Sequence, residues 1–167
     1  MTETTDTPSA EHGPARPRVP AATTTVAELE AVYRAWTSLP AMFFEQAAAC
    51  AGRPLLHVRR NERWHALTWS EVAERVRRAA RGLRSLGVEA GDRVVIVSEN
   101  RPEWLIADMA IMAAVAITVP AYTTATPSDL LHVLRDSGAR FAIVSTPALF
   151  RRLLPAALQA PELRALV

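Results

Sequence analysis

Residues 93–104, RVVIVSENRPEW, contain the stretch that decides the fold. Arg93–Ser98 is a short apolar run rich in β-branched residues, which predicts a strand buried on both faces. The polar residues that follow it predict a turn into a helix over 101–115, with Asn100 as the N-cap and Pro102 in the first turn. A buried strand that leads into a helix is typical of a parallel sheet.

The same alternation continues toward the carboxyl end. Ile117–Tyr122 and Phe141–Ser145 are predicted to be two further buried strands. The helix signals around them are Thr126, Pro127 and Asp129 at one start, Gly138 at the end of that helix, and Thr146 with Pro147 at the next start. Short strands separated by helices predict an α/β fold, here a partial parallel sheet with flanking helices.

A further helix precedes the first of these strands. Thr68 and Glu71 have the spacing of a capping box, and Gly87 supplies the residue that ends the helix. Its apolar residues recur every three or four positions and form one face; they are Val72, Val76, Ala79, Leu83 and Leu86.

The chain before Thr68 has two parts. Residues 1–34 are rich in Thr, Pro, Ala and Glu without a sustained period, and we expect a mostly disordered tail there. Residues 35–167 are expected to form one incomplete α/β domain. It begins with a helix over 39–50 that stops at Gly52, followed by two short strands at 55–59 and 63–68.

Composition excludes several classes of function. All 19 basic residues are arginine, so no lysine is present to act as a Schiff-base former or as the cation of a phosphate loop. The net charge of +2 is too small to indicate a nucleic acid or an anionic membrane as a partner. Cys50 is the single cysteine, which favours a reducing, cytoplasmic setting. The longest apolar run, Met109–Tyr122, is shorter than the roughly 20 residues of a membrane span.

No motif for catalysis, cofactor binding or metal binding emerges. The six glycines form neither a dinucleotide fingerprint nor a phosphate loop, and the serines lack the Gly-x-Ser-x-Gly pattern. For the remaining candidate residues we favour a structural role over a functional one. His57, His65 and His132 are scattered along the sequence, Cys50 is interpreted as a core residue, and Trp64 and Trp69 are interpreted as packing at a core edge. A row of arginines is interpreted as the solvated face of a helix, with Glu71–Arg75 and Glu74–Arg78 pairs.

The segment Ser98–Trp104 follows a strand that is predicted to be parallel, and α/β proteins place ligands at such strand ends. Capping by Asn100 and the favourable position of Glu103 in the first helical turn account for these residues structurally. We therefore assign no catalytic, cofactor-binding or metal residue in this chain.

The ordered motifs resemble AMP-forming acyl-CoA synthetases, the adenylate-forming ligase superfamily. Residues 86–94, LGVEAGDRV, are similar to the family's LGV-x-x-GDRV stretch, and residues 100–108 resemble the next helix of the long-chain fatty acyl-CoA branch. The similarity extends upstream to Thr68, Trp69 and Glu71 and downstream through Pro120, Tyr122 and the Ser137–Ala139 turn. It covers roughly residues 36–145.

The resemblance implies the first part of the large amino-terminal domain of such an enzyme. The family activates a carboxylate with ATP to form an acyl-adenylate, which the thiol of coenzyme A then attacks. The family's ATP loop ending in lysine, its ribose-binding aspartate and its catalytic lysine have no counterpart in this chain. ATP, Mg and CoA are therefore implied only for a full-length protein, which would be cytoplasmic and peripheral at the inner membrane surface.

Val115 departs from the family pattern, which has glycine before the second parallel strand. If that position has a positive φ, valine costs about 1 to 2 kcal/mol there.

Three hypotheses follow. The first is an amino-terminal fragment of a long-chain fatty acid–CoA ligase, inactive alone, poorly soluble, and partnered by the remainder of the ligase. The second is a non-catalytic interaction module that pairs with itself or with a full-length ligase. The third is an unrelated small α/β binding protein.

Overall fold

A computed structural model describes residues 25–167, apart from the side chains of Leu29, Val32 and Tyr33. The chain divides into two compact units, residues 1–37 and residues 38–167, each considered by itself. In the first unit, α1 spans Val26–Arg34. The backbone N–H of Thr25 donates to Glu28 Oε2 at 2.8 Å and that of Glu28 donates to Thr25 Oγ1 at 3.4 Å, a capping box. The prediction of a disordered tail was therefore wrong for residues 26–34, and the rest of that tail lies outside the described residues.

The second unit contains the predicted parallel sheet, with strand order β4-β3-β5-β6. The strands are β3 (Arg93–Val97), β4 (Ile117–Ala121), β5 (Phe141–Val144) and β6 (Ala165–Leu166). β3 pairs in parallel with β4 on one side and with β5 on the other, so the first predicted strand is central. The sequence did not predict β6, because its two residues carry too little periodicity to mark a strand.

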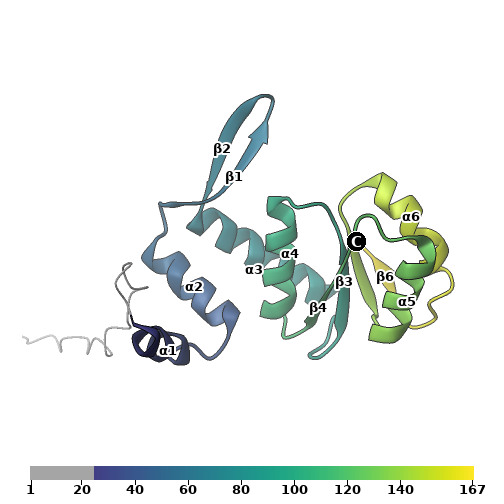
Figure 1. The fold of residues 1–167 in the computed structure, drawn as a ribbon, viewed down its shortest axis with the longest axis horizontal. Helices are drawn as coiled ribbons and strands as arrows, with labels where there is room; N and C mark the ends of the chain where they lie inside the picture. Colours follow the sequence, from purple (N-terminus) through teal and green to yellow (C-terminus); the bar gives the residue numbers. More distant parts are fainter. Residues whose placement is uncertain (1–24) are drawn as a thin grey trace, which may run out of the picture. The chain divides into compact units, whose positions relative to one another are not determined.

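Helices cover both faces of this sheet. Figure 1 shows α2 (Leu39–Ala49), α3 (Trp69–Ser85) and α4 (Pro102–Ala113) on one side, and α5 (Pro127–Ser137) and α6 (Pro147–Ala157) on the other. Alternate residues of β3 point to opposite faces. Val94 and Ile96 therefore pack in the core under α2, α3 and α4, whereas Val95 and Val97 pack under α5 and α6.

Local side-chain signals set the helix starts. The capping boxes predicted at Thr68 with Glu71 and at Thr126 with Asp129 are both present. The prediction of Asn100 as the cap of α4 was wrong. Arg101 is the N-cap residue and makes no side-chain cap bond, because its guanidinium carries donors only. Pro102 occupies the first helical position, where a missing N–H costs nothing.

The two strands before α3 form a hairpin of their own. β1 (Pro54–Arg60) and β2 (Arg63–Thr68) pair antiparallel and belong to no larger sheet. The turn between them contains Asn61 and Glu62, both with positive φ. Figure 1 shows the far end of this hairpin projecting away from the helices.

Three helices end with the same backbone turn, and one of them uses valine. At the end of α4, Val115 has a φ of 64°, its N–H donates to Met112 O at 3.0 Å, and the N–H of Ala116 donates to Ile111 O at 3.0 Å. These two bonds form a Schellman motif. α3 and α5 end in the same motif, with Gly87 and Gly138 at the position that Val115 occupies in α4. Val115 thus has the positive φ on which the expected cost of valine at this position depends.

Replacing Val115 with glycine should therefore stabilise the protein by about 1 kcal/mol. The valine side chain is 60% exposed, so its removal loses little buried area, and the left-handed backbone is no longer strained. Urea denaturation followed by circular dichroism measures the change. The matched control is Gly87→Val, which places the same side chain on the equivalent turn of α3 and should destabilise. An unchanged midpoint for Val115→Gly would show that the turn relaxes around valine.

Charged residues hold the amino ends of the strands together. Asp92, which is 4% exposed, accepts from Arg140 Nη1 at 2.7 Å and from the N–H of Glu89 at 2.9 Å. Arg93 donates to three backbone carbonyls, namely Ser137 O at 2.7 Å, Gly138 O at 2.9 Å and Gly91 O at 3.2 Å. Asp92 and Arg93 of the GDRV motif thus connect the loop before β3 to the turn before β5.

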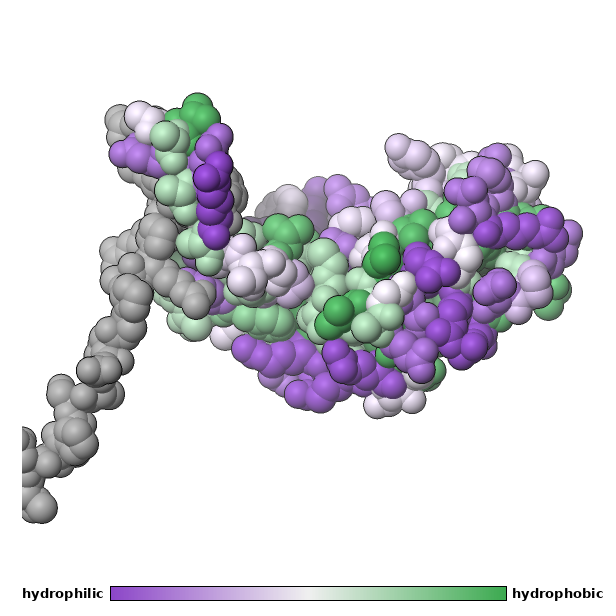
Figure 2. Space-filling view, turned by 90° about the horizontal axis from the view of Figure 1, so that it is seen from below, coloured by the Kyte–Doolittle hydropathy of each residue, from purple (hydrophilic) through white to green (hydrophobic). Residues whose placement is uncertain are grey.

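The surface of residues 38–167 mixes polar and apolar side chains. In Figure 2, hydrophobic residues reach the surface between hydrophilic ones on the face shown. Val115 and Ile117 are among the large hydrophobic residues that are more than half exposed. No helix within residues 25–167 combines the length and the apolar character that a membrane span requires.

Candidate functional site

The carboxyl ends of the parallel strands form the candidate site. Because β3, β4 and β5 run in the same direction, the segments that follow them meet at one edge of the sheet. A pocket of about 360 Å³ opens there. Its lining residues come from the β3–α4 and β4–α5 connections, from the first turn of α4 and from the end of β4; they are Ser98, Glu99, Asn100, Trp104, Pro120, Ala121, Tyr122 and Thr123.

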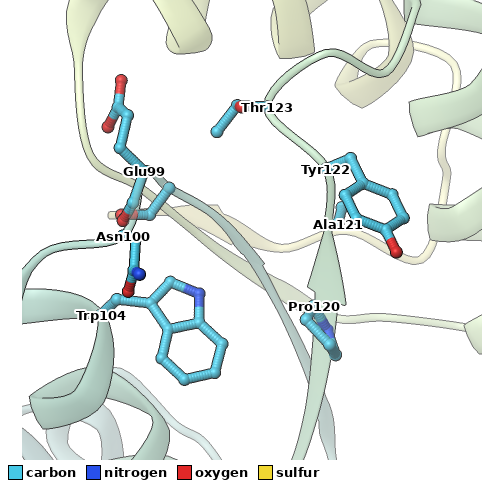
Figure 3. A pocket seen from close by; sticks show the side chains of 8 residues that line it. Glu99, Asn100, Trp104, Pro120, Ala121, Tyr122 and Thr123 are labelled. Carbon is cyan, nitrogen blue, oxygen red and sulfur yellow. The ribbon is translucent and has the colours of Figure 1, made fainter.

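Trp104 and Tyr122 are the aromatic residues that line this pocket. In Figure 3 the indole of Trp104 projects from α4 toward the side of β4, where Pro120 and Tyr122 lie. Glu99 and Asn100 line the same wall as Trp104, and Thr123 lies above Tyr122. Tyr122 is 86% exposed, so its ring is available to a ligand or to another part of a larger protein. The pocket therefore combines a flat apolar surface with a few polar groups, as small-molecule sites do.

Trp104 also separates this pocket from two others. A second cavity, lined by Ile96, Ile143, Val144 and Val167 among others, shares Ser98 and Trp104 with the first. A third, beside Leu56 and His57 of β1, shares Asn100 and Trp104. The indole is thus common to all three hollows at this edge of the sheet.

Hydrogen bonds keep the carboxylates of this region ionised. The hydroxyl of Ser145 donates to Glu99 and is the main cause that lowers the pKa of Glu99. Arg101 Nε donates to Glu103 at 2.9 Å and lowers the pKa of Glu103, against the opposing effect of burial. A carboxylate with a lowered pKa is a weak base, so neither residue is tuned for general acid–base catalysis near neutral pH.

The structure places the other predicted candidates apart from this pocket. His57 lies on β1 and His65 lies on β2, but they are not cross-strand partners of each other. His132 lies on α5. Cys50 is the C-cap of α2 and is half-buried. The described residues 25–167 contain no group of three or more His, Cys, Asp or Glu side chains placed to bind a metal ion.

The predictions for tryptophan and arginine need correction. Trp69 packs at the core, with its ring centroid 5.8 Å from that of Phe43, but Trp64 is 70% exposed because the hairpin has no layer over it. On α3 the expected Glu74–Arg78 pair is replaced by Glu74 with Arg77 at 3.8 Å and Arg81 at 3.6 Å.

Glu71 and Arg77 make further interactions on α3. The carboxylate of Glu71 accepts from the N–H of Thr68 at 2.7 Å in the capping box, which lowers the pKa of Glu71, and the charge of Arg75, its predicted partner, lowers it further. The guanidinium of Arg77 lies 4.9 Å from the ring centroid of Phe44, a cation–π contact that periodicity alone does not reveal.

A parallel sheet with helices on both faces and a pocket at its strand ends defines an α/β protein. A family model described as AMP-binding enzyme matches residues 43–166. The chain therefore belongs to the AMP-binding enzyme family.

Individual relatives agree with this family. The chain is 53% identical over 76 residues to the long-chain-fatty-acid–CoA ligase FadD15 of Mycobacterium tuberculosis, a match that covers 46% of this chain and 13% of the relative. It is 29% identical over 126 residues to the human long-chain-fatty-acid–CoA ligase ACSBG1, covering 75% of this chain and 17% of that protein. It therefore spans less than one fifth of the length of these two curated relatives.

Solved structures show the same fold. A benzoate CoA ligase from Burkholderia xenovorans superimposes with a TM-score of 0.67 at 27% identity, covering 78% of this chain and 25% of that chain. The similarity therefore includes most of the sheet and its helices.

Proposed function

We propose that this chain forms the amino-terminal part of an acyl-CoA ligase that activates a fatty acid with ATP and transfers the acyl group to CoA. The observation that carries this proposal is the 53% identity to a long-chain-fatty-acid–CoA ligase, in a chain whose family match extends over 43–166. In that setting the chain supplies scaffold. Asp92 and Arg93 fix the amino ends of the strands, and Trp104 and Tyr122 present the strand-end pocket to the rest of the enzyme.

The chemistry itself would come from residues beyond this chain. The sequence has no lysine and no phosphate loop, and the carboxylates nearest the pocket have lowered pKa values. ATP, magnesium and CoA would therefore be bound mainly by the remainder of the ligase.

The open edge of the sheet at β4 supports the proposal that the remainder of a ligase packs against this chain. Among the described strands, β4 has a neighbour on one side only. Ile117 on this strand is 51% exposed, and the hydroxyl of Thr118 is buried without a hydrogen-bond partner. An open edge with exposed apolar residues favours association, and we expect the remainder of the ligase to cover it. A self-partner or a separate full-length ligase would use the same edge.

A chimera tests the proposal. The segment of the Mycobacterium tuberculosis FadD15 ligase that corresponds to residues 43–166 is replaced by those residues, and the chimera is assayed for CoA thioester formation from a long-chain fatty acid. We expect activity within about tenfold of the parent, because the replaced segment is scaffold. The 167-residue chain alone should release no pyrophosphate from ATP.

The outcomes separate the hypotheses. A folded chimera without activity would contradict the proposal and favour a non-catalytic interaction module. Pyrophosphate release by the chain alone would contradict the assignment of the chemistry to other residues. The similarity to a benzoate CoA ligase makes an aromatic acid the second candidate substrate. A chimera that gains activity on benzoate relative to its parent would favour that acid.

A further inference from the structure

The tip of the β1–β2 hairpin, residues 59–65, has a composition that the fold does not require. Every one of these residues is exposed, and no other described strand pairs with the ribbon. Trp64 is 70% exposed, although a tryptophan of a single domain is usually highly buried. An exposed indole on a projecting ribbon needs an explanation other than packing.

Positive charge is concentrated at the same tip. Arg59, Arg60 and Arg63 stand against one acidic residue, Glu62, which leaves a local charge of +2 on seven residues. Arg60 and Arg63 are direct cross-strand partners. Like charges directly opposite each other destabilise a hairpin, so this arrangement costs folding energy that a bound anion would offset.

Ion pairs relieve this charge only weakly. Arg59 lies 3.6 Å from Glu62 and Arg60 lies 3.3 Å from Glu103, but all four side chains are 44% exposed or more. Exposed pairs of this kind contribute little and exchange readily with other anions.

Trp64 and Arg59 share one face of the ribbon, because they are direct cross-strand partners. The face thus presents an indole beside a guanidinium. Tryptophan is the side chain that membrane interfaces select, with its ring at the level of the headgroups, and arginine binds phosphates through its planar fork. We propose that the hairpin tip docks on an anionic phospholipid surface.

A membrane fits this tip better than a protein partner does. A stable protein interface buries about 800 Å² on each side, which a tip of seven residues on a two-stranded ribbon does not offer. An interfacial anchor needs only one or two aromatic residues and a few basic ones. The net charge of +2 for the whole chain does not oppose this, since the attraction acts locally.

The choice of a phospholipid surface as the partner rests in part on the proposed function, because a fatty acid, the proposed substrate, partitions into bilayers. The vesicle experiment below measures no catalysis, so the two proposals can fail separately. A ligase that docks by this hairpin would meet its substrate at the membrane surface.

Cosedimentation of the 167-residue chain with vesicles tests the docking. Vesicles of phosphatidylcholine with 30% phosphatidylglycerol should bind the chain, with a blue shift of tryptophan fluorescence, and pure phosphatidylcholine should bind it far less. Arg59→Glu, on the same face as Trp64, should weaken binding about 25-fold, since each charge near such a surface contributes about fivefold. Trp64→Ala should weaken it about tenfold and remove most of the blue shift.

Matched substitutions elsewhere control for general effects. Arg78→Glu on the exposed face of α3 makes the same change in net charge, and Leu158→Ala removes another exposed apolar side chain. Both variants should bind within about threefold of the wild type, and circular dichroism should show all four variants folded. The proposal is overturned if the wild type does not bind anionic vesicles, or if Trp64→Ala and Arg59→Glu bind as the two controls do. Absence of vesicle binding with capture of an acidic protein at the same tip would also overturn it.

Discussion

Replacing Asp92 with alanine should lower the free energy of unfolding by about 3 kcal/mol, the largest effect that we expect from a single charged residue here. The carboxylate is 4% exposed and joins two otherwise separate segments through Arg140 Nη1 at 2.7 Å and the N–H of Glu89 at 2.9 Å. Its own carbonyl accepts from the N–H of Ile117 at the start of β4. Removing the side chain leaves a half-buried guanidinium and a backbone donor without their main acceptor.

Two variants make this measurement specific. Asp92→Asn keeps the shape and one acceptor but removes the charge, and should cost about half as much. Glu89→Ala removes the exposed carboxylate that lies 3.2 Å from the same Arg140 Nη1 and should change stability by less than about 0.5 kcal/mol. Denaturation midpoints in urea at constant slope give all three values. Equal midpoints for Asp92→Ala and Glu89→Ala would contradict the assigned role of the buried pair.

The buried pair also has a pH signature. Burial raises the pKa of Asp92, but the bonds from Glu89 N–H and Arg140 outweigh it and leave the pKa below the ordinary value of 3.8. The contribution of the ionised group is therefore complete above the unfolded pKa and is lost as the pH falls through the folded pKa. The difference in stability between the wild type and Asp92→Asn should be constant above about pH 5 and should shrink below pH 4.

Much of the fold was predictable because its signals are local. The apolar run of β3 predicted a strand buried on both faces, and Val94 to Val97 are fully buried. Capping boxes at Thr68 and Thr126 marked two helix starts correctly. Thr25 and Glu28 form the same capping box at the start of α1, but the composition of the surrounding residues led to the prediction of a disordered tail there.

The candidate site was less predictable because it depends on which segments meet in space. Sequence placed Ser98–Trp104 at a strand end and explained these residues by capping alone. The pocket exists because β4 lies next to β3 and brings Tyr122 and Thr123 opposite Trp104. The exposure of Trp64 was hidden for a similar reason, since periodicity does not say whether a hairpin has another layer over it.

Gly138→Ala should be the second largest change, with a loss of about 2 to 3 kcal/mol. Gly138 has a φ of 58°, and a Cβ there would lie 2.8 Å from Arg93 Nη2. The substitution therefore adds the strain of a left-handed backbone, about 1 kcal/mol, to the displacement of a guanidinium that donates to three carbonyls. Those bonds carry the remaining cost, because Arg93 joins the end of α5 to the start of β3.

Gly87→Ala separates the two contributions. Gly87 ends α3 with a φ of 90°, but nothing lies within 4 Å of a Cβ added there, so this variant measures the backbone strain alone. In a chain that already carries Arg93→Ala, the cost of Gly138→Ala should fall to the value for Gly87→Ala, since no guanidinium is left to displace. An additive double variant would mean that Arg93 moves aside without loss. The coupling therefore measures how strongly the arginine of the GDRV motif holds this sheet together.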